Sequence, residues 1–265
     1  MALPRLVFIG SGNVATHLAL VFSEKGYPVL QVYSRTEESA AALAGKINCP
    51  YTTDITLLDA RADVYICALK DSVLQEVLSQ ASFHHKLVLH TAGSLPMDIL
   101  SEYTANYGVF YPLQTFSKNR PVDFSNIPVF IESNRPENFL VVKSLAGNVS
   151  DVVYEADSEQ RKKLHLAAVF ACNFTNHLYA IAAKIVNENG DFPVEVLLPL
   201  IDETAKKIHA LSPLEAQTGP AVRDDKNVID KQLKMLDSDK DVQQIYKLMS
   251  KHIYTVNSMV LKERK

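Results

Sequence analysis

The chain has 265 residues, of which 47% are hydrophobic and 22% are charged, a mix typical of a globular protein with a full hydrophobic core. The formal net charge of −3 offers no basic surface to a phosphate backbone, so we expect no nucleic-acid partner. The spacing of Cys49, Cys67 and Cys172 fits neither a metal cluster nor a disulfide framework. With no signal peptide and no run that approaches membrane-spanning length, we expect a cytoplasmic protein without a metal or a membrane partner.

The first half of the chain alternates short apolar runs with amphipathic helical patterns. Strands are expected over 5–9, 29–33, 51–53, 63–69, 87–91, 107–111, 127–131 and 152–154. Helices are expected over 13–25, 37–44 and 96–103, with Gly45 ending the second and Ser72 capping one after the fourth strand. This alternation predicts an α/β Rossmann domain over 1–156, with a doubly wound, largely parallel sheet covered on both faces.

The second half of the chain carries helical patterns only, so 157–265 is expected to form an all-α C-terminal domain. Its helices are expected over 158–187, 194–211, 227–236 and 239–262. Pro199 should kink the second of these helices. Ser212 and Glu215 have the spacing of a capping box.

A dinucleotide-binding fingerprint lies between the first strand and the first helix. Gly10, Gly12 and Ala15 form a G-x-G-x-x-A pattern in the strand–turn–helix context that gives it meaning. The first glycine permits a tight turn, the second lets backbone approach a pyrophosphate, and the alanine allows close packing of helix on strand. The helix N-terminus then offers free N–H groups to the phosphates. The predicted cofactor contacts in this turn are Gly10, Ser11, Gly12, Asn13 and Val14; the alternative is a glycine turn without a ligand.

The residues after the second strand bear on the type of cofactor. NAD sites place an acidic residue there for the ribose 2′-hydroxyl, whereas this chain has Ser34, Arg35 and Thr36. A guanidinium can pair with a 2′-phosphate and the hydroxyls can donate to it, so NADP is the expected cofactor. Alternatively, Arg35 is a solvated turn residue and one of the hydroxyls caps the next helix.

Polar residues also follow the later strands, at the edge where an open α/β sheet binds its ligands. The expected cofactor contacts after the fourth strand are Ala68, Leu69 and Lys70. The expected substrate contacts, for a carbonyl or carboxylate, are Thr91, Ser94 and Gln114. Ordinary turn chemistry explains these segments equally well.

Polar groups interrupt an apolar stripe on the long helix that opens the second half. His165, Val169, Cys172 and Asn176 share one face at helical spacing, with Asn173 beside it. Buried polar groups need partners, and a histidine at a cleft is a natural general acid. We therefore predict that His165 gives a proton to the substrate and that Asn173 positions it. A hydrogen bond between domains or subunits is the alternative.

Several segments in their order along the chain resemble a bacterial family of NADP oxidoreductases. The segment 9–15, I-G-S-G-N-V-A, is similar to the opening of pyrroline-5-carboxylate reductases and deazaflavin-dependent NADP reductases. The more specific segments are V-L-H-T-A-G-S (88–94), Y-P-L-Q-T-F (111–116), H-L-A-A-V-F-A-C-N (165–173) and T-G-P-A-V-R-D-D (218–225). The family joins a Rossmann-like domain to a helical domain similar to the C-terminal domain of 6-phosphogluconate dehydrogenase. The resemblance implies a homodimer paired through the helical domain.

The leading hypothesis is an NADP(H)-dependent oxidoreductase that transfers hydride between nicotinamide and a small carbonyl, imine or hydroxy-acid substrate. A sensor or scaffold that binds NADP(H) without turnover is the alternative, since fold alone does not decide function.

Overall fold

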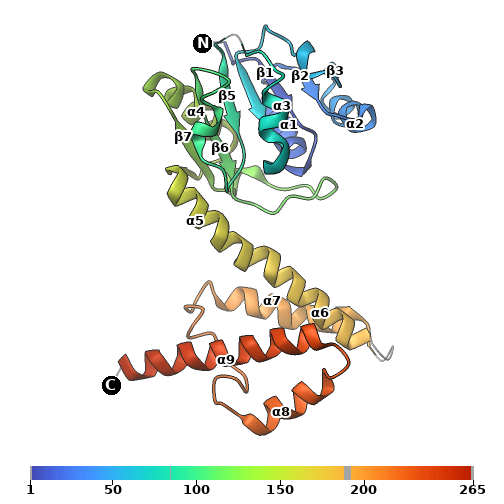
Figure 1. Cartoon of the computed structure of the whole chain (residues 1–265), viewed down its shortest axis with the longest axis vertical. Helices are drawn as coiled ribbons and strands as arrows, with labels where there is room; N and C mark the ends of the chain where they lie inside the picture. The colour runs from blue at the N-terminus through green and yellow to red at the C-terminus, as the bar shows by residue number, and fades with distance from the viewer. Residues whose placement is uncertain (1, 84, 188–191, 264–265) are drawn as a thin grey trace. The chain divides into compact units, whose positions relative to one another are not determined.

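The computed structural model describes residues 2–83, 85–187 and 192–263 (Figure 1). Its contacts divide the chain into two compact units, Met1–Phe174 and Thr175–Lys265. The division falls within a helical run that begins at Ser158, later than the change of sequence pattern near residue 157. The first turns of this run belong to the first unit because the side chain of Arg161 is fully buried there.

The described part of the first unit is built on one eight-stranded sheet. The strands are β1 (Leu6–Ile9), β2 (Val29–Tyr33), β3 (Tyr51–Thr52), β4 (Val64–Cys67), β5 (Leu87–His90), β6 (Tyr107–Pro112), β7 (Val129–Ser133) and β8 (Val153–Glu155). Their order is β3-β2-β1-β4-β5-β6-β7-β8, and β6–β7 is the antiparallel pair among parallel ones. The largely parallel Rossmann-like sheet is therefore confirmed. The strand order reverses between β1 and β4, which is where such sheets bind their ligands.

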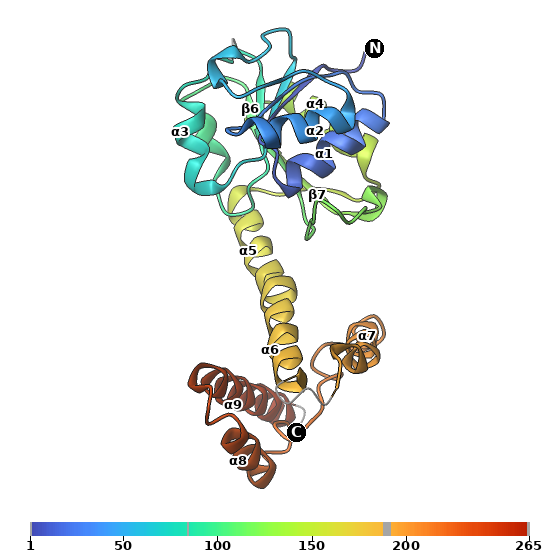
Figure 2. The same cartoon turned by 90° about the vertical axis from the view of Figure 1, so that its right-hand side faces the viewer.

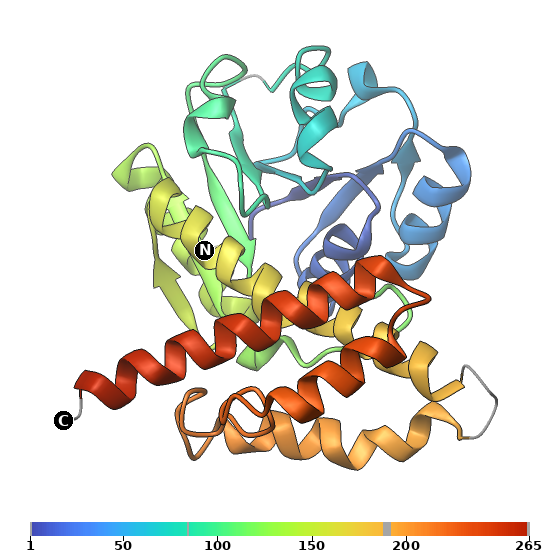
Figure 3. The ribbon, with the colours of Figure 1, turned by 60° about the horizontal axis from the view of Figure 1, so that its bottom comes forward.

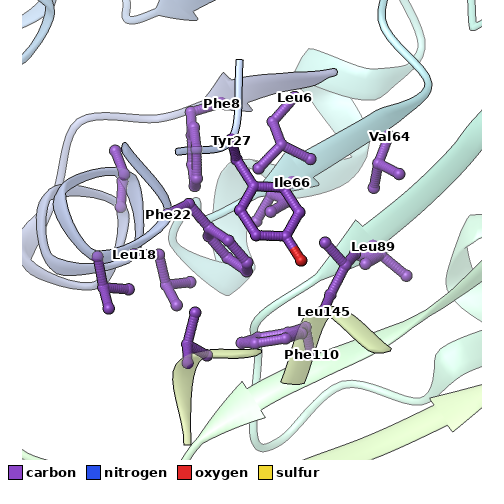
Figure 4. Close-up of a cluster of buried hydrophobic side chains, with 14 of the residues drawn as sticks. Leu6, Phe8, Leu18, Phe22, Tyr27, Val64, Ile66, Leu89, Phe110 and Leu145 are labelled. Atoms are coloured by element: carbon purple, nitrogen blue, oxygen red, sulfur yellow. The ribbon is translucent and has the colours of Figure 1, made fainter. Parts of the chain in front are cut away.

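Helices cover both faces of this sheet. The helices are α1 (Asn13–Glu24), α2 (Glu37–Ile47), α3 (Leu74–Leu78) and α4 (Pro136–Val149). The apolar residues of α1, α2 and α4 pack on one face, where Figure 2 shows these helices together, and those of α3 pack on the other. In β1, Leu6 and Phe8 enter the first cluster, drawn in Figure 4, while Val7 and Ile9 enter the second. Burial on both faces explains why β1 reads as an unbroken apolar run.

Three local predictions in the first unit need correction, and one helix was not predicted. Gly45 lies inside α2, which continues to Ile47 and is ended by Asn48 in a left-handed conformation with φ 51°. Ser72 lies within a 3₁₀ turn and does not cap α3. The helix expected over 96–103 is only the 3₁₀ turn Met97–Leu100. Helix α4 was not expected, although Pro136 in its first turn is a recognised start signal.

The second unit is helical, as the sequence predicts. The helical run beginning at Ser158 consists of α5 (Ser158–Ala168), a π-helical turn (Val169–Phe174) and α6 (Thr175–Asn187), of which α6 lies in the second unit. The other helices described there are α7 (Leu198–Lys207), α8 (Lys226–Met235) and α9 (Lys240–Glu263), with α8 beside α9 (Figure 3). Pro199 lies in the first turn of α7 and does not kink it. The Ser212–Glu215 capping bonds form, but around a turn rather than a regular helix.

Two expectations concern the helical run that begins at Ser158. The π turn inserts about one extra residue in a turn, which departs from the regular spacing that predicted a shared face for His165, Val169, Cys172 and Asn176. His165, Val169 and Cys172 are half-buried, whereas Asn176 is exposed. Within the described residues, the run Ser158–Asn187 is long and apolar enough to cross a membrane by length and composition. The expectation that no run approaches that length is therefore wrong.

Candidate functional site

The tight turn between β1 and α1 requires glycine at position 10. Gly10 has φ +116°, and a Cβ on it would lie 2.4 Å from the carbonyl oxygen of Ala68. The same Cβ would lie 3.3 Å from a methyl carbon of Leu69. The turn therefore packs directly on the segment that follows β4, which places two of the predicted cofactor contacts beside it.

The leading end of α1 is open to a ligand. Gly12 is the N-cap residue, no side chain caps the helix, and a Cβ on Gly12 would have no heavy atom within 4 Å. Gly12 and Asn13 are exposed, Val14 is half-buried, and Ala15 is fully buried against the sheet. Since the first amides of an α-helix have no partner within it, this end presents several N–H donors to an anion.

The end of β2 is joined to the same turn. The hydroxyl of Ser11 donates to that of Ser34 at 2.8 Å, so Ser34 contacts the glycine turn instead of capping α2. Thr36 occupies the N-cap position of α2, but its side chain makes no capping bond. Arg35 is exposed and forms no ion pair within the described ranges. The capping alternative for the two hydroxyls is therefore wrong, and all three groups can contact a 2′-phosphate.

A second cluster lies at the carboxyl end of β6, where the loop after β5 and helix α5 meet it. The hydroxyl of Tyr111 lies 3.0 Å from Nδ1 of His165. Gly93 fits against both rings, because a Cβ on it would lie 2.6 Å from Nδ1 of His165 and 2.8 Å from Cζ of Tyr111. Three segments that are distant in sequence thus meet at a single hydrogen-bonded pair.

The pair is suited to hold and move a proton. Burial raises the pKa of the Tyr111 phenol to about 12, against the opposing charge of Arg161. The phenol therefore keeps its proton at neutral pH and can donate it. His165 is half-buried, and its imidazole can accept or return a proton at Nδ1.

The loop after β5 is held by two buried side chains. The side chain of Arg161 is fully buried and donates from Nε to the carbonyl of Ala92 at 3.2 Å. It also pairs with Glu132 and donates to the carbonyl of Leu95. Nδ1 of His90 accepts the amide of Ala92 at 3.1 Å. Burial and, secondarily, the Arg161 charge lower the pKa of His90 to about 3, so this imidazole is neutral.

The other predicted residues have mixed environments. Thr91 is buried at the end of β5, and its amide donates to the carbonyl of Cys67 at 3.2 Å. Ser94 donates to Asp71. Lys70 is exposed and precedes the 3₁₀ turn Asp71–Val73.

No described hydrogen bond joins Gln114 or Asn173, two of the predicted substrate contacts, to the Tyr111–His165 pair. Gln114 is exposed, and its side-chain oxygen accepts the amide of Thr115 at 2.8 Å, which is turn chemistry. Asn173 is exposed in the π turn.

Tyr111, Arg161 and Glu132 were not among the predicted site residues. Tyr111 stands three residues before Gln114 at the same carboxyl edge of the sheet, so the rule that selected Gln114 applies to it as well. Arg161 is one helical turn before His165, a spacing that places two side chains on one face. It stands in the polar run 158–163, which is typical of a solvated helix start, so its burial left no signal in the sequence.

Comparison with known proteins agrees with this geometry. Residues 5–93 match the family described as "NADP oxidoreductase coenzyme F420-dependent", and residues 127–253 match "Domain of unknown function (DUF2520)". A solved structure from Bacteroides fragilis, named as a "putative NADP oxidoreductase", is 50% identical with a TM-score of 0.90, covering 96% of this chain and 98% of that one. None of the curated proteins matches the chain.

More distant solved structures share the fold. A reductive aminase from Aspergillus terreus in complex with NADPH is 15% identical with a TM-score of 0.66, covering 99% of this chain and 95% of that one. A 1-pyrroline-5-carboxylate reductase from Streptococcus pyogenes is 15% identical with a TM-score of 0.61, covering 95% of this chain and 98% of that one.

Proposed function

Because the chain belongs to the family of NADP oxidoreductases that carry the DUF2520 domain, we propose that it is an NADPH-dependent reductase of a small C=N or C=O compound. The observation that carries the proposal is the turn at Gly10, which packs on Ala68 and leaves the first amides of α1 uncapped. An uncapped helix end with a glycine at its N-cap is suited to a diphosphate.

The 2′-phosphate of NADPH has a matching set of donors at the end of β2. Arg35 is exposed and forms no ion pair within the described residues. Thr36 follows it, and the side chain of Thr36 makes no capping bond to α2. Ser34 is tied to Ser11 of the phosphate turn, so a ligand on this turn would also reach the end of β2. This arrangement supports NADPH over NADH, since a guanidinium forms strong charge-assisted bonds to phosphate.

The Tyr111–His165 pair would deliver the proton. NADPH, when bound, supplies a hydride to the carbon of the C=N or C=O group. The nitrogen or oxygen that gains the electron pair takes a proton from the hydroxyl of Tyr111. His165, hydrogen-bonded to that hydroxyl at 3.0 Å, then returns a proton to it from solvent. Thr91 keeps its predicted role as a substrate contact.

The names of the structural relatives favour imines among the possible substrates. A reductive aminase, an imine reductase and pyrroline-5-carboxylate reductases share this fold. A protonated phenol is a suitable donor to the amine nitrogen that forms as the imine is reduced, because it stays neutral in a partly buried site.

The test combines binding with turnover. Calorimetric titration should show tighter binding of NADPH than of NADH, and a panel of cyclic imines and aldehyde–amine mixtures should contain a compound that consumes NADPH. Tyr111→Phe should keep the NADPH affinity and lose most of the turnover. Binding without turnover on the whole panel would favour the sensor or scaffold, and no binding of either cofactor would contradict both functions.

A homodimer and a cytoplasmic location remain part of this proposal. In the second unit, Leu200, Met235 and Leu248 are 66%, 77% and 68% exposed, and an apolar groove of about 360 Å³ lies between α6, α8 and α9. Exposed apolar surface of this kind is usually covered by a partner. Sedimentation of the full chain without detergent should give a dimer. Aggregation that detergent reverses would instead favour a membrane.

A further inference from the structure

Arg161 occupies an unusual place for a charged side chain, since it is fully buried at the start of α5. We propose that Arg161 is a positioning residue, which fixes the loop after β5 against the Tyr111–His165 pair and, paired with Glu132, holds a charge at the base of this proton-donating site. The proposal rests on the proposed function, and it assigns a role to a side chain that is fully buried and bonded to two carbonyls and a carboxylate of the chain itself.

Several hydrogen bonds hold the loop 91–97 in place. Arg161 holds the carbonyls of Ala92 and Leu95, which lie on either side of Gly93 and Ser94. Further bonds pin the same loop: the amide of Met97 donates to Ser158 at 2.9 Å, and Ser158 in turn donates to Glu132 at 3.0 Å. The guanidinium is therefore the centre of a network that joins the loop, α5 and β7.

This network sets how the loop meets the proton-donating pair. Gly93, between the two carbonyls that Arg161 holds, lies against the rings of His165 and Tyr111 with no room for even a methyl group. His165 is one turn after Arg161, so the side chain that holds the loop belongs to the same helix as the imidazole that the loop contacts. A displacement of about 1 Å at such a site lowers turnover by roughly a hundredfold.

The electrostatic part concerns the phenol. His165 of α5 contacts the Tyr111 hydroxyl, and the charge of Arg161 on the same helix acts on it. Glu132 of β7 acts on the phenol indirectly, through its ion pair with Arg161. The positive charge of Arg161 lowers the pKa of Tyr111 and thereby opposes the effect of burial. Glu132 offsets part of that charge, so we expect the ion pair to adjust the acidity of the phenol, beneath the larger effect of burial.

The first experiment observes the phenol directly and needs no substrate. The full chain is labelled with 3-fluorotyrosine, whose phenol ionises at a lower pH than that of tyrosine, and titrated by ¹⁹F NMR. The Tyr111 signal is the one absent from Tyr111→Phe. Arg161→Gln should move its titration to higher pH, and Glu132→Gln should move it to lower pH. Lys162→Gln is the matched control, since it removes a cation of the same helix that pairs with Glu159 instead.

The second experiment separates geometry from charge. Arg161→Lys keeps the charge but cannot hold two carbonyls and a carboxylate with one planar fork. It should leave the Tyr111 titration near that of the wild type, lower kcat by roughly ten- to a hundredfold, and leave the Kd of NADPH unchanged. Far-ultraviolet circular dichroism confirms that each variant is folded before it is compared.

The outcomes are distinguishable from failure of the proposed function. Opposite shifts for Arg161→Gln and Glu132→Gln support the electrostatic role even if no substrate is found. Unchanged Tyr111 titration in both folded variants overturns the electrostatic role. Wild-type kcat in Arg161→Lys overturns the geometric role. If Arg161→Gln does not fold, Glu132→Gln alone still tests the direction of the shift.

Discussion

The two halves of the candidate site are built in different ways. At the cofactor end, the turn from Gly10 to Ala15 is formed by neighbouring residues, and backbone atoms face the expected ligand. At the proton-donor end, Tyr111 and His165 are 54 positions apart, and the loop beside them is held by an ion pair between Arg161 of α5 and Glu132 of β7. The cofactor end is formed by residues that are close together in the sequence, whereas the proton-donor end forms only when distant segments come together in the fold. Substitutions should therefore affect the two ends separately.

The largest effect is expected from Gly10→Ala at the cofactor end. The new Cβ would lie 2.4 Å from a backbone oxygen of Ala68, on a residue with φ +116°, so the turn must open. We expect the affinity for NADPH to fall by roughly a hundredfold or more, because backbone strain and the displaced amides act together. Gly12→Ala, whose Cβ meets open space, is a control for folding alone and should have the wild-type stability. Calorimetric titration and thermal unfolding check both, and equal affinities in wild type and Gly10→Ala would contradict the account.

Gly93→Ala should damage the opposite end. Its Cβ would press on the rings of His165 and Tyr111, so the hydrogen bond between them must lengthen. We expect kcat to fall by roughly a hundredfold while the Kd of NADPH stays within a factor of two or so of the wild type. Steady-state kinetics and titration on the same preparation check the separation. A parallel loss of cofactor affinity would show that the two ends are one unit.

His90 should make the first unit sensitive to acid. Its pKa is lowered to about 3 in the folded chain, chiefly by burial, while an unfolded histidine takes up a proton near pH 6.5. The unfolded state therefore binds the extra proton, and the free energy of unfolding should fall by about 1.4 kcal/mol for each pH unit below 6.5. Urea unfolding at pH 7 and pH 5 measures this change. His90→Asn keeps an acceptor for the Ala92 amide and should flatten the dependence; an unchanged slope would refute the assignment.

Arg35→Ala should have the smallest effect of these substitutions, and it tests the contact to the 2′-phosphate at the cofactor end. Loss of one charge-assisted contact to a 2′-phosphate is expected to weaken NADPH binding by roughly tenfold and to leave NADH binding unaltered. Lys46→Ala, on the exposed last turn of α2, is a control for loss of surface charge. Calorimetric titration with both nucleotides checks the difference. If both weakened equally, Arg35 would not contact the 2′-phosphate.

The sequence was informative where local chemistry decides structure. The Gly10 turn, the strands from β1 to β8 and the helical second half follow from periodicity and fingerprint residues. Predictions failed where one signal outweighed a competing one. Gly45 was predicted to end α2, but the helix continues to Ile47 and the left-handed conformation of Asn48 ends it. The π turn at Val169–Phe174 interrupts the regular helical period, and residue spacing alone does not reveal such a turn.

The proton-donor end shows why part of the site could not be predicted from the sequence. Arg161 stands among charged residues and is typical of a solvated helix start, yet its side chain is fully buried. Its burial depends on the carbonyls of Ala92 and Leu95 and on Glu132, which come from other elements. No local pattern records such a network, because each partner is satisfied only by the assembled fold.

The claim on which the account rests is that the β1–α1 turn binds the diphosphate of NADP(H). A crystal of the full chain soaked with NADPH tests it most directly. The account predicts phosphate oxygens within hydrogen-bond distance of the amides at the start of α1, with the 2′-phosphate beside Arg35. A soaked crystal with NADPH bound elsewhere, or with the turn from Gly10 to Ala15 closed by its own side chains, would contradict it.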